Sequence, residues 1–162
     1  VSAVALDQCD ESARIVRQGL RANPNHFGLR NNLVFALASA DHLDEAQAEL
    51  LKIPIDDAAQ HERIALIATT GLIEFRLGRA EAGRAAYEKA FALARASKDQ
   101  DFITSLVVFW AREEALAKTD LAPKILSQAT EAIKRNKNRP GTDALEAMLS
   151  RYLDSKRNVR KK

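Results

Sequence analysis

The residues most capable of chemistry are scattered along the chain and form no catalytic or metal-binding set. His26, His42 and His61 stand singly at expected helix starts or turns, with no second His or Cys at ligand spacing. Cys9 is the single cysteine and has no histidine near it in the sequence, which favours a structural thiol over a nucleophile. We therefore predict surface histidines, no metal site and no cofactor.

Two pairs of adjacent acidic residues and two glycines belong to residue types that perform acid–base catalysis or bind phosphate in other proteins. The pair Asp56–Asp57 precedes an expected helix, where negative charge suits the helix dipole. The pair Glu113–Glu114 is expected on an exposed helical face. Gly71 and Gly78 do not form a phosphate loop, because neither lies in a glycine-rich turn after a strand. We find no catalytic constellation and expect that the chain is not an enzyme.

Positive charge is concentrated at the C-terminal end. Residues 1–133 hold fifteen Lys and Arg against nineteen Asp and Glu, whereas residues 134–162 hold ten against three. The dense blocks are KRNKNR at 134–139 and KRNVRKK at 156–162. Such blocks attract phosphates or stay solvated, and we favour the solvated interpretation, because basic residues also suit a helix C-terminus. Nucleic-acid binding through this region is kept as an alternative.

Length and composition indicate a folded helical chain. The chain has 162 residues, of which 46% are hydrophobic, with six Gly and four Pro. That is enough to bury one core or the continuous core of a short solenoid. The most apolar segment, FITSLVVFW, is too short to span a bilayer, so we expect no membrane insertion. A lone cysteine makes the cytoplasm the expected location. The opening VSAVAL lacks Met, so we expect residue 1 to lie inside a longer protein.

Hydrophobic periodicity predicts an all-α fold. Apolar residues recur at three- and four-residue steps, and no segment alternates as a strand does. Breaks are expected where helices should stop, at 22–26, 39–42, 53–57, 77–79, 97–101, 118–120 and 136–143. Thr142 starts a last amphipathic helix. We predict about seven helices joined by short turns, so that consecutive helices are antiparallel neighbours.

A shift of 37 residues superposes two helical pairs, which indicates a repeat. The matched positions are Ala40 with Leu77, Asp41 with Gly78, Ala46 with Gly83, and Leu50 with Tyr87. Gly71 lies seven residues before Gly78, and Ala90 lies seven after Gly83. This pattern of small, aromatic and small residues resembles the tetratricopeptide repeat (TPR) family, as found in bacterial proteins. The resemblance implies that Gly71 faces Gly83 at a close crossing of two helices.

The resemblance further implies a right-handed superhelical stack of antiparallel helical hairpins, a TPR-like α-solenoid. Its expected ranges are a repeat domain over 1–155, with a partial hairpin at 1–24, hairpins at 25–54, 56–97 and 98–135, a capping helix at 141–153, and a basic tail at 156–162. The chain departs from the family at Val34, where a small residue is preferred, and at Pro54, which ends a helix early.

A concave groove is the binding surface that the resemblance implies. Carried over residue by residue, the groove positions that we expect to bind a partner are Asn31, Phe35, Leu72, Phe75, Arg76, Phe109 and Arg112. Of these, Phe75, Arg76 and Arg112 should be partly exposed. Asn31 has no Lys partner at the positions of the family's carboxylate clamp, so that subclass is weakly supported. Trp110 is expected in the core.

The expected function is that of a protein–protein interaction scaffold, which binds a partner peptide or domain in the concave groove. One alternative is a regulatory or dimerising segment of a larger enzyme or signalling protein, which allows a homodimer. The other is a nucleic-acid-associated protein that uses the basic C-terminal region, and we do not expect nucleic acid as the partner.

Overall fold

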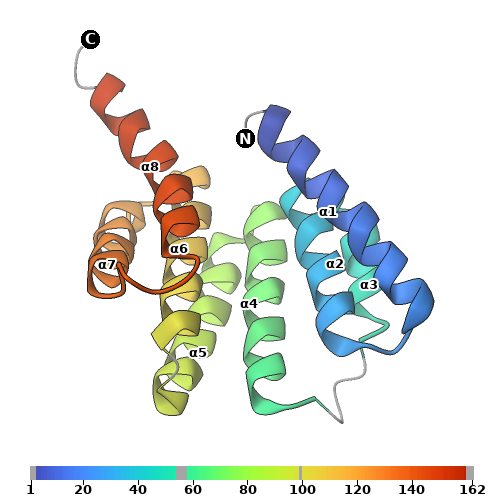
Figure 1. Cartoon of the computed structure of the whole chain (residues 1–162). Coiled ribbons are helices and arrows are strands. Elements are labelled where there is room, and N and C mark those ends of the chain that lie inside the picture. The colour runs from blue at the N-terminus through green and yellow to red at the C-terminus, as the bar shows by residue number, and fades with distance from the viewer. Residues whose placement is uncertain (1–2, 54–57, 99, 160–162) are drawn as a thin grey trace. The chain divides into compact units, whose positions relative to one another are not determined.

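The computed structural model describes residues 3–53, 58–98 and 100–159, and within these ranges the chain is all-helical (Figure 1). Eight helices are present in the described ranges, and no strand is found there. Their bounds are α1 Ala3–Ala22, α2 Phe27–Ser39, α3 Leu43–Leu50, α4 Gln60–Arg76, α5 Ala80–Ser97, α6 Gln100–Leu116, α7 Ala122–Arg135 and α8 Thr142–Val159. The predicted total of about seven was one too low, because seven periodic segments each form a helix and the terminal segment adds the eighth.

Both ends of the described chain differ from the predicted ranges. Helix α1 is one continuous helix of 20 residues, where a remnant of one helix followed by a second was expected. No proline interrupts it, so nothing in its sequence ends the helix before Asn23 and Pro24. Helix α8 continues to Val159, beyond the expected capping helix at 141–153. The expected basic tail therefore begins inside a helix, and Pro54, the expected end of the first hairpin, lies outside the described residues.

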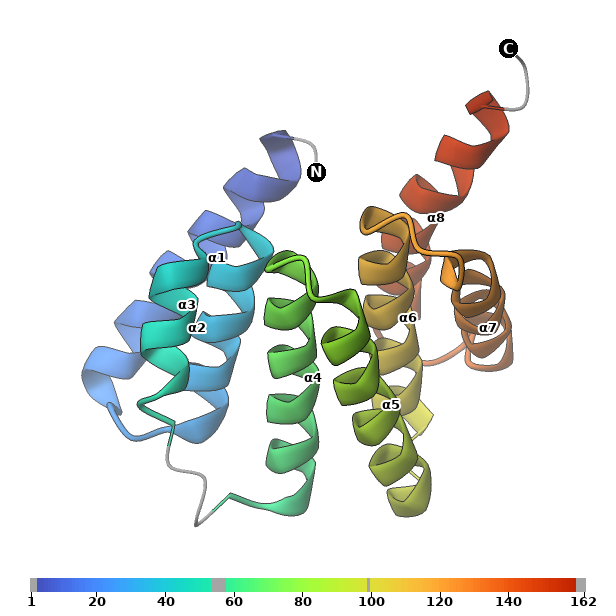
Figure 2. The same cartoon turned by 180° about the vertical axis from the view of Figure 1, so that it is seen from behind.

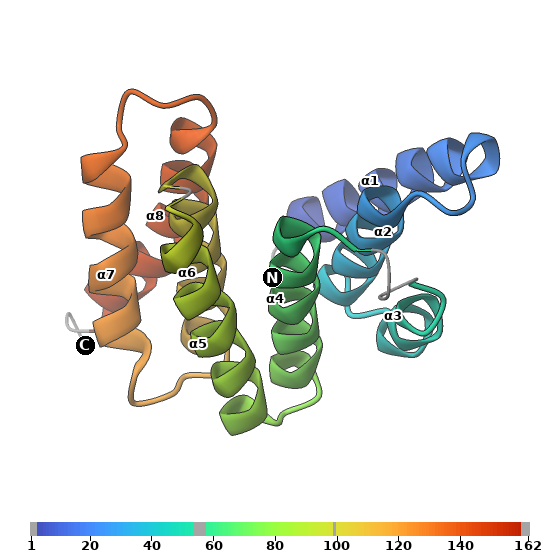
Figure 3. The same cartoon turned by 90° about the horizontal axis from the view of Figure 1, so that it is seen from below.

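The chain divides into two compact units, residues 1–86 and residues 87–162, and the boundary falls within α5. In the first unit, α2 contacts α1, α3 and α4 (Figure 3). A helix with neighbours on three sides needs apolar residues around most of its circumference, and α2 supplies them with buried Leu33, Val34 and Leu37. Val34 is thus a core residue at the position where the TPR pattern has a small one.

In the second unit, α6 contacts α7 and α8, and α7 also contacts α8 (Figure 2). Helix α7 buries Ile125, Leu126, Ala129 and Ile133, which recur at the spacing of one helical face. Trp110 of α6 is buried and stacks on Tyr87 of α5, with the ring centroids 6.2 Å apart and the planes 4° from parallel. The predicted core position of Trp110 is confirmed.

Three turns between helices share one backbone geometry. The second residue after the end of α2, α4 and α6 has a positive φ, namely 65° at Asp41, 77° at Gly78 and 53° at Lys118. In each turn the next N–H donates to the carbonyl five residues back. These bonds join His42 to Leu37 at 2.9 Å, Arg79 to Glu74 at 2.9 Å, and Thr119 to Glu114 at 3.2 Å. This is the Schellman arrangement, which satisfies carbonyls that a helix end leaves unpaired.

The close crossing predicted at Gly83 is present in the first unit, where the start of α5 follows α4 (Figure 2). A Cβ on Gly83 would lie 2.9 Å from the Gly71 carbonyl oxygen and 2.5 Å from Cδ2 of Phe75. Both distances are shorter than side chains tolerate, so only glycine fits here. The structure therefore confirms that Gly71 faces Gly83, and it adds Phe75 as the side chain that fills the space Gly83 leaves.

Candidate binding site

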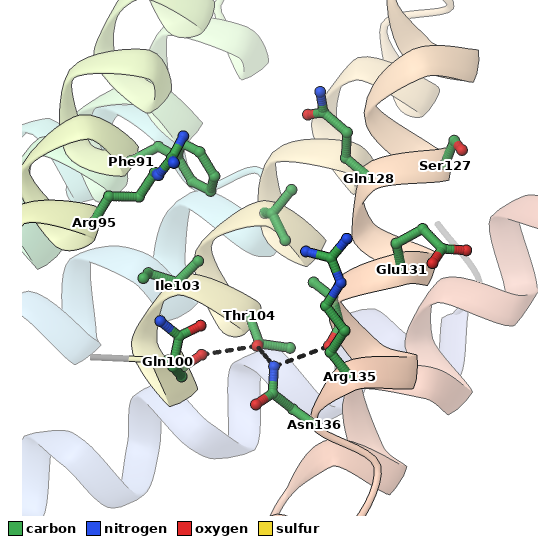
Figure 4. Close-up of a pocket in the computed structure, with 12 residues that line it drawn as sticks. Phe91, Arg95, Gln100, Ile103, Thr104, Ser127, Gln128, Glu131, Arg135 and Asn136 are labelled. Carbon is green, nitrogen blue, oxygen red and sulfur yellow. Dashed lines mark hydrogen bonds between the residues drawn. The ribbon is translucent and has the colours of Figure 1, made fainter. Parts of the chain in front are cut away.

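A pocket with a volume of about 660 Å³ lies in the second unit between α5, α6 and α7 (Figure 4). Its lining combines charged, amide, hydroxyl and apolar side chains. The residues are Phe91 and Arg95 from α5; Gln100, Ile103, Thr104 and Val107 from α6; and Ser127, Gln128, Glu131, Ala132, Arg135 and Asn136 from α7 and its C-cap. Pockets of this size commonly hold small ligands or a few residues of a peptide.

Helical spacing explains why these residues meet. Phe91 and Arg95 are four residues apart on α5, so they share one face of that helix. On α7, Ser127, Glu131 and Arg135 also follow one another at four-residue steps. Each helix thus turns one mixed stripe towards the pocket. In Figure 4, Arg95 and Phe91 lie on the α5 side, and Gln128, Glu131 and Arg135 lie on the α7 side.

One end of the pocket is held by a hydrogen-bond network. The Thr104 hydroxyl donates to the Gln100 carbonyl at 2.8 Å and accepts from Nδ2 of Asn136 at 2.9 Å (Figure 4). Nδ2 of Asn136 also donates to the Ala132 carbonyl at 3.0 Å, and the Thr142 hydroxyl donates to the Asn136 carbonyl at 2.9 Å. The network joins α6, the C-terminus of α7 and the start of α8, so this end of the pocket is preorganised.

Two positively charged side chains of the pocket, Arg95 and Arg135, have no acidic partner in the part of the chain that the structure describes. The Arg95 guanidinium lies 5.9 Å from the centroid of the Phe91 ring, a cation–π contact. Within the described residues, neither Arg95 nor Arg135 forms an ion pair. Glu131 is paired instead with Lys134, at 3.0 Å. The side chains of Gln100, Ser127 and Gln128 make no hydrogen bond to any other described residue, so their polar atoms are available to a ligand.

The sequence-predicted groove residues are mostly buried. The exposed fraction is 7% for Asn31, 0% for Leu72, 6% for Phe75 and 8% for Arg112. Phe35, Arg76 and Phe109 are half-buried. The expectation that Phe75 and Arg112 are partly exposed is therefore wrong, although a partner-binding role for the seven residues stays an untested prediction.

Local contacts explain this burial. Phe75 fills the space beside Gly83. The Arg112 guanidinium lies 5.2 Å from the centroid of the Phe109 ring and pairs with Glu113 at 2.5 Å. Arg76 pairs with Asp41, at 2.8 Å, in the turn after α2. The charges of Arg76 and Arg112 are therefore already engaged.

The pair Glu113–Glu114 was predicted on an exposed face, and the structure corrects this. The exposed fraction is 1% for Glu113 and 0% for Glu114. Glu114 accepts a hydrogen bond from Nε1 of Trp110 at 2.9 Å and another from the Thr119 hydroxyl. A buried carboxylate requires such donors, and here it links α6 to the turn that follows. The Asp56–Asp57 pair lies outside the described residues.

The remaining chemistry-bearing residues have structural positions. Nδ1 of His26 accepts from the Leu29 N–H at 3.3 Å and caps α2, and Nε2 of His42 lies 3.0 Å from a carboxylate oxygen of Asp10. His61 is exposed at the start of α4, as predicted, and Cys9 is half-buried. Among the described residues, no group of three or more His, Cys, Asp or Glu side chains could hold a metal ion.

Sequence reasoning missed the pocket because its lining comes from faces of three separate helices. The available signal was the four-residue spacing of Phe91 with Arg95 and of Ser127, Glu131 and Arg135. Spacing identifies a helical face, but it does not say which faces from different helices meet.

Comparisons of this chain with known protein families, with curated proteins and with solved structures find no match. The resemblance to TPR proteins therefore stays a prediction. No helix among the described residues combines the length and apolar character that crossing a membrane requires.

Proposed function

We propose that this chain is a protein-interaction module that binds a segment of a partner protein in the pocket between α5, α6 and α7. The observation that carries the proposal is the lining of that pocket. The guanidiniums of Arg95 and Arg135, which form no ion pair with any described residue, stand there beside available amide and hydroxyl groups. The proposed site therefore lies between α5, α6 and α7 and not at the groove residues predicted from the sequence.

The mixed lining suits an extended peptide. Gln100, Gln128 and Ser127 offer donors and acceptors to a peptide backbone, while Phe91 and Ile103 offer apolar contact. Polar groups fix the orientation of a ligand, and apolar contact supplies much of the affinity.

We propose that the helical pairs stack in the right-handed manner of TPR proteins, supported by the shared turns at Asp41, Gly78 and Lys118 and by the close approach of Gly71 and Gly83. A cytoplasmic location is proposed from the single cysteine, Cys9.

Selection from a library of short random peptides displayed on phage tests this function. Ser127 lines the pocket and is exposed, so Ser127→Trp fills the site without entering the core. Gln47→Trp is the matched control, because Gln47 is exposed on α3, which is part of the other unit. Peptides selected on the wild-type protein should bind Gln47→Trp equally well and lose about tenfold or more in affinity on Ser127→Trp.

Two results would contradict the proposal. One is a library that yields no enriched peptide. The other is a set of enriched peptides that bind Ser127→Trp and the wild-type protein with equal affinity, because their site would then lie elsewhere on the chain.

A further inference from the structure

Arg95 and Arg135 are two positive side chains that border one pocket and have no acidic partner among the described residues. Several other arginines among the described residues form ion pairs. Arg30 pairs with Glu49 at 2.7 Å and Arg79 pairs with Glu74 at 2.5 Å. The two pocket arginines belong to different helices, α5 and α7, so their common position is a property of the fold.

We infer that this pocket selects partner segments that carry a carboxylate, and that Arg95 and Arg135 bind it. The inference rests on the proposed function and adds the chemistry of the partner. A guanidinium donates charge-assisted hydrogen bonds in a planar fork that matches the two oxygens of a carboxylate. Ser127 and Gln128, on the same wall as Arg135, add neutral donors for oxygens that the arginines leave unbound.

The charges of the pocket favour a carboxylate over a phosphate. Glu131 stands on the same helical stripe as Arg135 and is one of the residues that line the pocket. A phosphate group carries nearly two negative charges at neutral pH and is repelled by Glu131 more strongly than a singly charged carboxylate. Glu131 also accepts hydrogen bonds, and the backbone N–H groups of a peptide supply suitable donors.

The apolar part of the lining indicates what stands next to the carboxylate. Phe91, Ile103 and Val107 come from the adjacent faces of α5 and α6. The Phe91 ring already lies beside the Arg95 guanidinium, so the apolar and the positive parts of the pocket are neighbours. An acidic residue flanked by an apolar residue therefore fits this lining.

The basic run at residues 134–139 strengthens the attraction without giving it selectivity. Lys137 belongs to this run and is exposed, but it does not line the pocket. Its charge acts through the solvent and is screened by salt, whereas a guanidinium in the pocket contacts its ligand directly. Lys137→Gln therefore removes the same charge as Arg135→Gln and leaves the pocket lining intact, which makes it the matched control.

The test uses pools of short peptides that share the same random flanking residues and differ at one central position. The central residue is Glu, Gln or phosphoserine, and both peptide ends are blocked. A further pool has Gln at the centre and a free C-terminal carboxylate. Fluorescence anisotropy measures the affinity of each labelled pool for the full chain and for the variants Arg95→Gln, Arg135→Gln, Lys137→Gln and Ser127→Trp.

The inference predicts that the pool with central Glu binds about tenfold more tightly than the blocked pool with central Gln. Arg95→Gln and Arg135→Gln should each remove most of that difference, and Lys137→Gln should change it by less than about threefold. Selective binding of the Glu pool assigns the carboxylate to a side chain. Selective binding of the pool with a free C-terminus assigns it to the chain end, and either source supports the inference.

Other results separate the failure of the inference from the failure of the proposed function. If the Gln and Glu pools bind equally and both lose affinity on Ser127→Trp, the pocket binds peptides but does not select a carboxylate, and the inference is overturned. Tighter binding of the phosphoserine pool overturns it in favour of a phosphate. If no pool binds, or if Ser127→Trp changes nothing, the proposed function and the inference are both wrong.

Discussion

Gly83 shows how the absence of one side chain determines the packing of α4 against the start of α5. The Gly71 carbonyl and the buried Phe75 ring occupy the space where a Cβ would stand. The sequence correctly predicted that the two glycines face each other, because a close crossing of two helices leaves room only for small residues. The position of Phe75 could not be predicted in the same way, since an aromatic residue beside a glycine suits a groove as well as a core.

At this scale we predict that Gly83→Ala destabilises the protein, although alanine is the better helix former. The added methyl group meets a backbone oxygen and a buried ring, and such overpacking costs about 1–3 kcal/mol, against a gain of about 1 kcal/mol from helix propensity. Chemical denaturation should therefore show a lower free energy of unfolding.

Ala85→Gly is the control for helix propensity, since Ala85 is exposed on the same helix. It should cost about 1 kcal/mol from propensity alone. If helix propensity alone decided the outcome at both positions, Gly83→Ala would raise the free energy of unfolding and Ala85→Gly would lower it. A stabilised Gly83→Ala protein would show that the close crossing is absent.

At the scale of elements, the turns after α2, α4 and α6 are the most regular feature of the chain. Sequence matched Asp41 with Gly78, and both have a positive φ. Lys118 was predicted only as part of a break, because lysine gives no signal for left-handed backbone. Helix starts and stops were readable from Pro, Gly, Asn and Asp, whereas the uninterrupted α1 shows that a family pattern can suggest a break where the local sequence has none.

Lys118 has a left-handed backbone, with φ at 53°, although it is not a glycine. A residue other than glycine in the left-handed region costs about 1–2 kcal/mol. We therefore expect Lys118→Gly to raise the free energy of unfolding by roughly 0.5–1 kcal/mol, after the larger backbone entropy that glycine loses on folding. Thermal and chemical denaturation measure the change.

Two controls isolate the backbone effect. Lys118→Ala removes the same side chain and should give no gain, because alanine has a Cβ. Lys124→Gly lies inside α7 and should cost about 1 kcal/mol. A Lys118→Gly protein less stable than the Lys118→Ala protein would contradict a left-handed Lys118.

At the scale of the whole molecule, hydrophobic periodicity placed the chain in the all-α class, and the described residues agree. The same reasoning could not locate a binding site. The candidate pocket requires one face from each of three helices, and the faces meet only after α5, α6 and α7 pack. Its arginines were also hidden among the 25 Lys and Arg residues of the chain, since a sequence does not show which of them lack an acidic neighbour in space.

Positive charge is concentrated in residues 134–162, which carry ten Lys and Arg against three acidic residues. We expect no measurable binding of single- or double-stranded DNA or RNA at about 0.15 M salt, where exposed charges are screened beyond roughly 8 Å. Anisotropy titrations at several salt concentrations measure this. Tight binding that falls steeply with salt, and that weakens when residues 156–162 are removed, would favour the nucleic-acid alternative.

The central claim is that partner segments bind between α5, α6 and α7, and nuclear magnetic resonance tests it most directly. The full chain, labelled with ¹⁵N, is titrated with the tightest peptide from the selection. We expect the side-chain amide signals of Gln100 and Gln128 and the backbone signals of Arg95 and Arg135 to shift. The signals of Asn31, Phe35 and Arg76 should stay unchanged. Shifts at Asn31, Phe35 and Arg76 with an unchanged pocket would contradict the account and return the site to the groove predicted from the sequence.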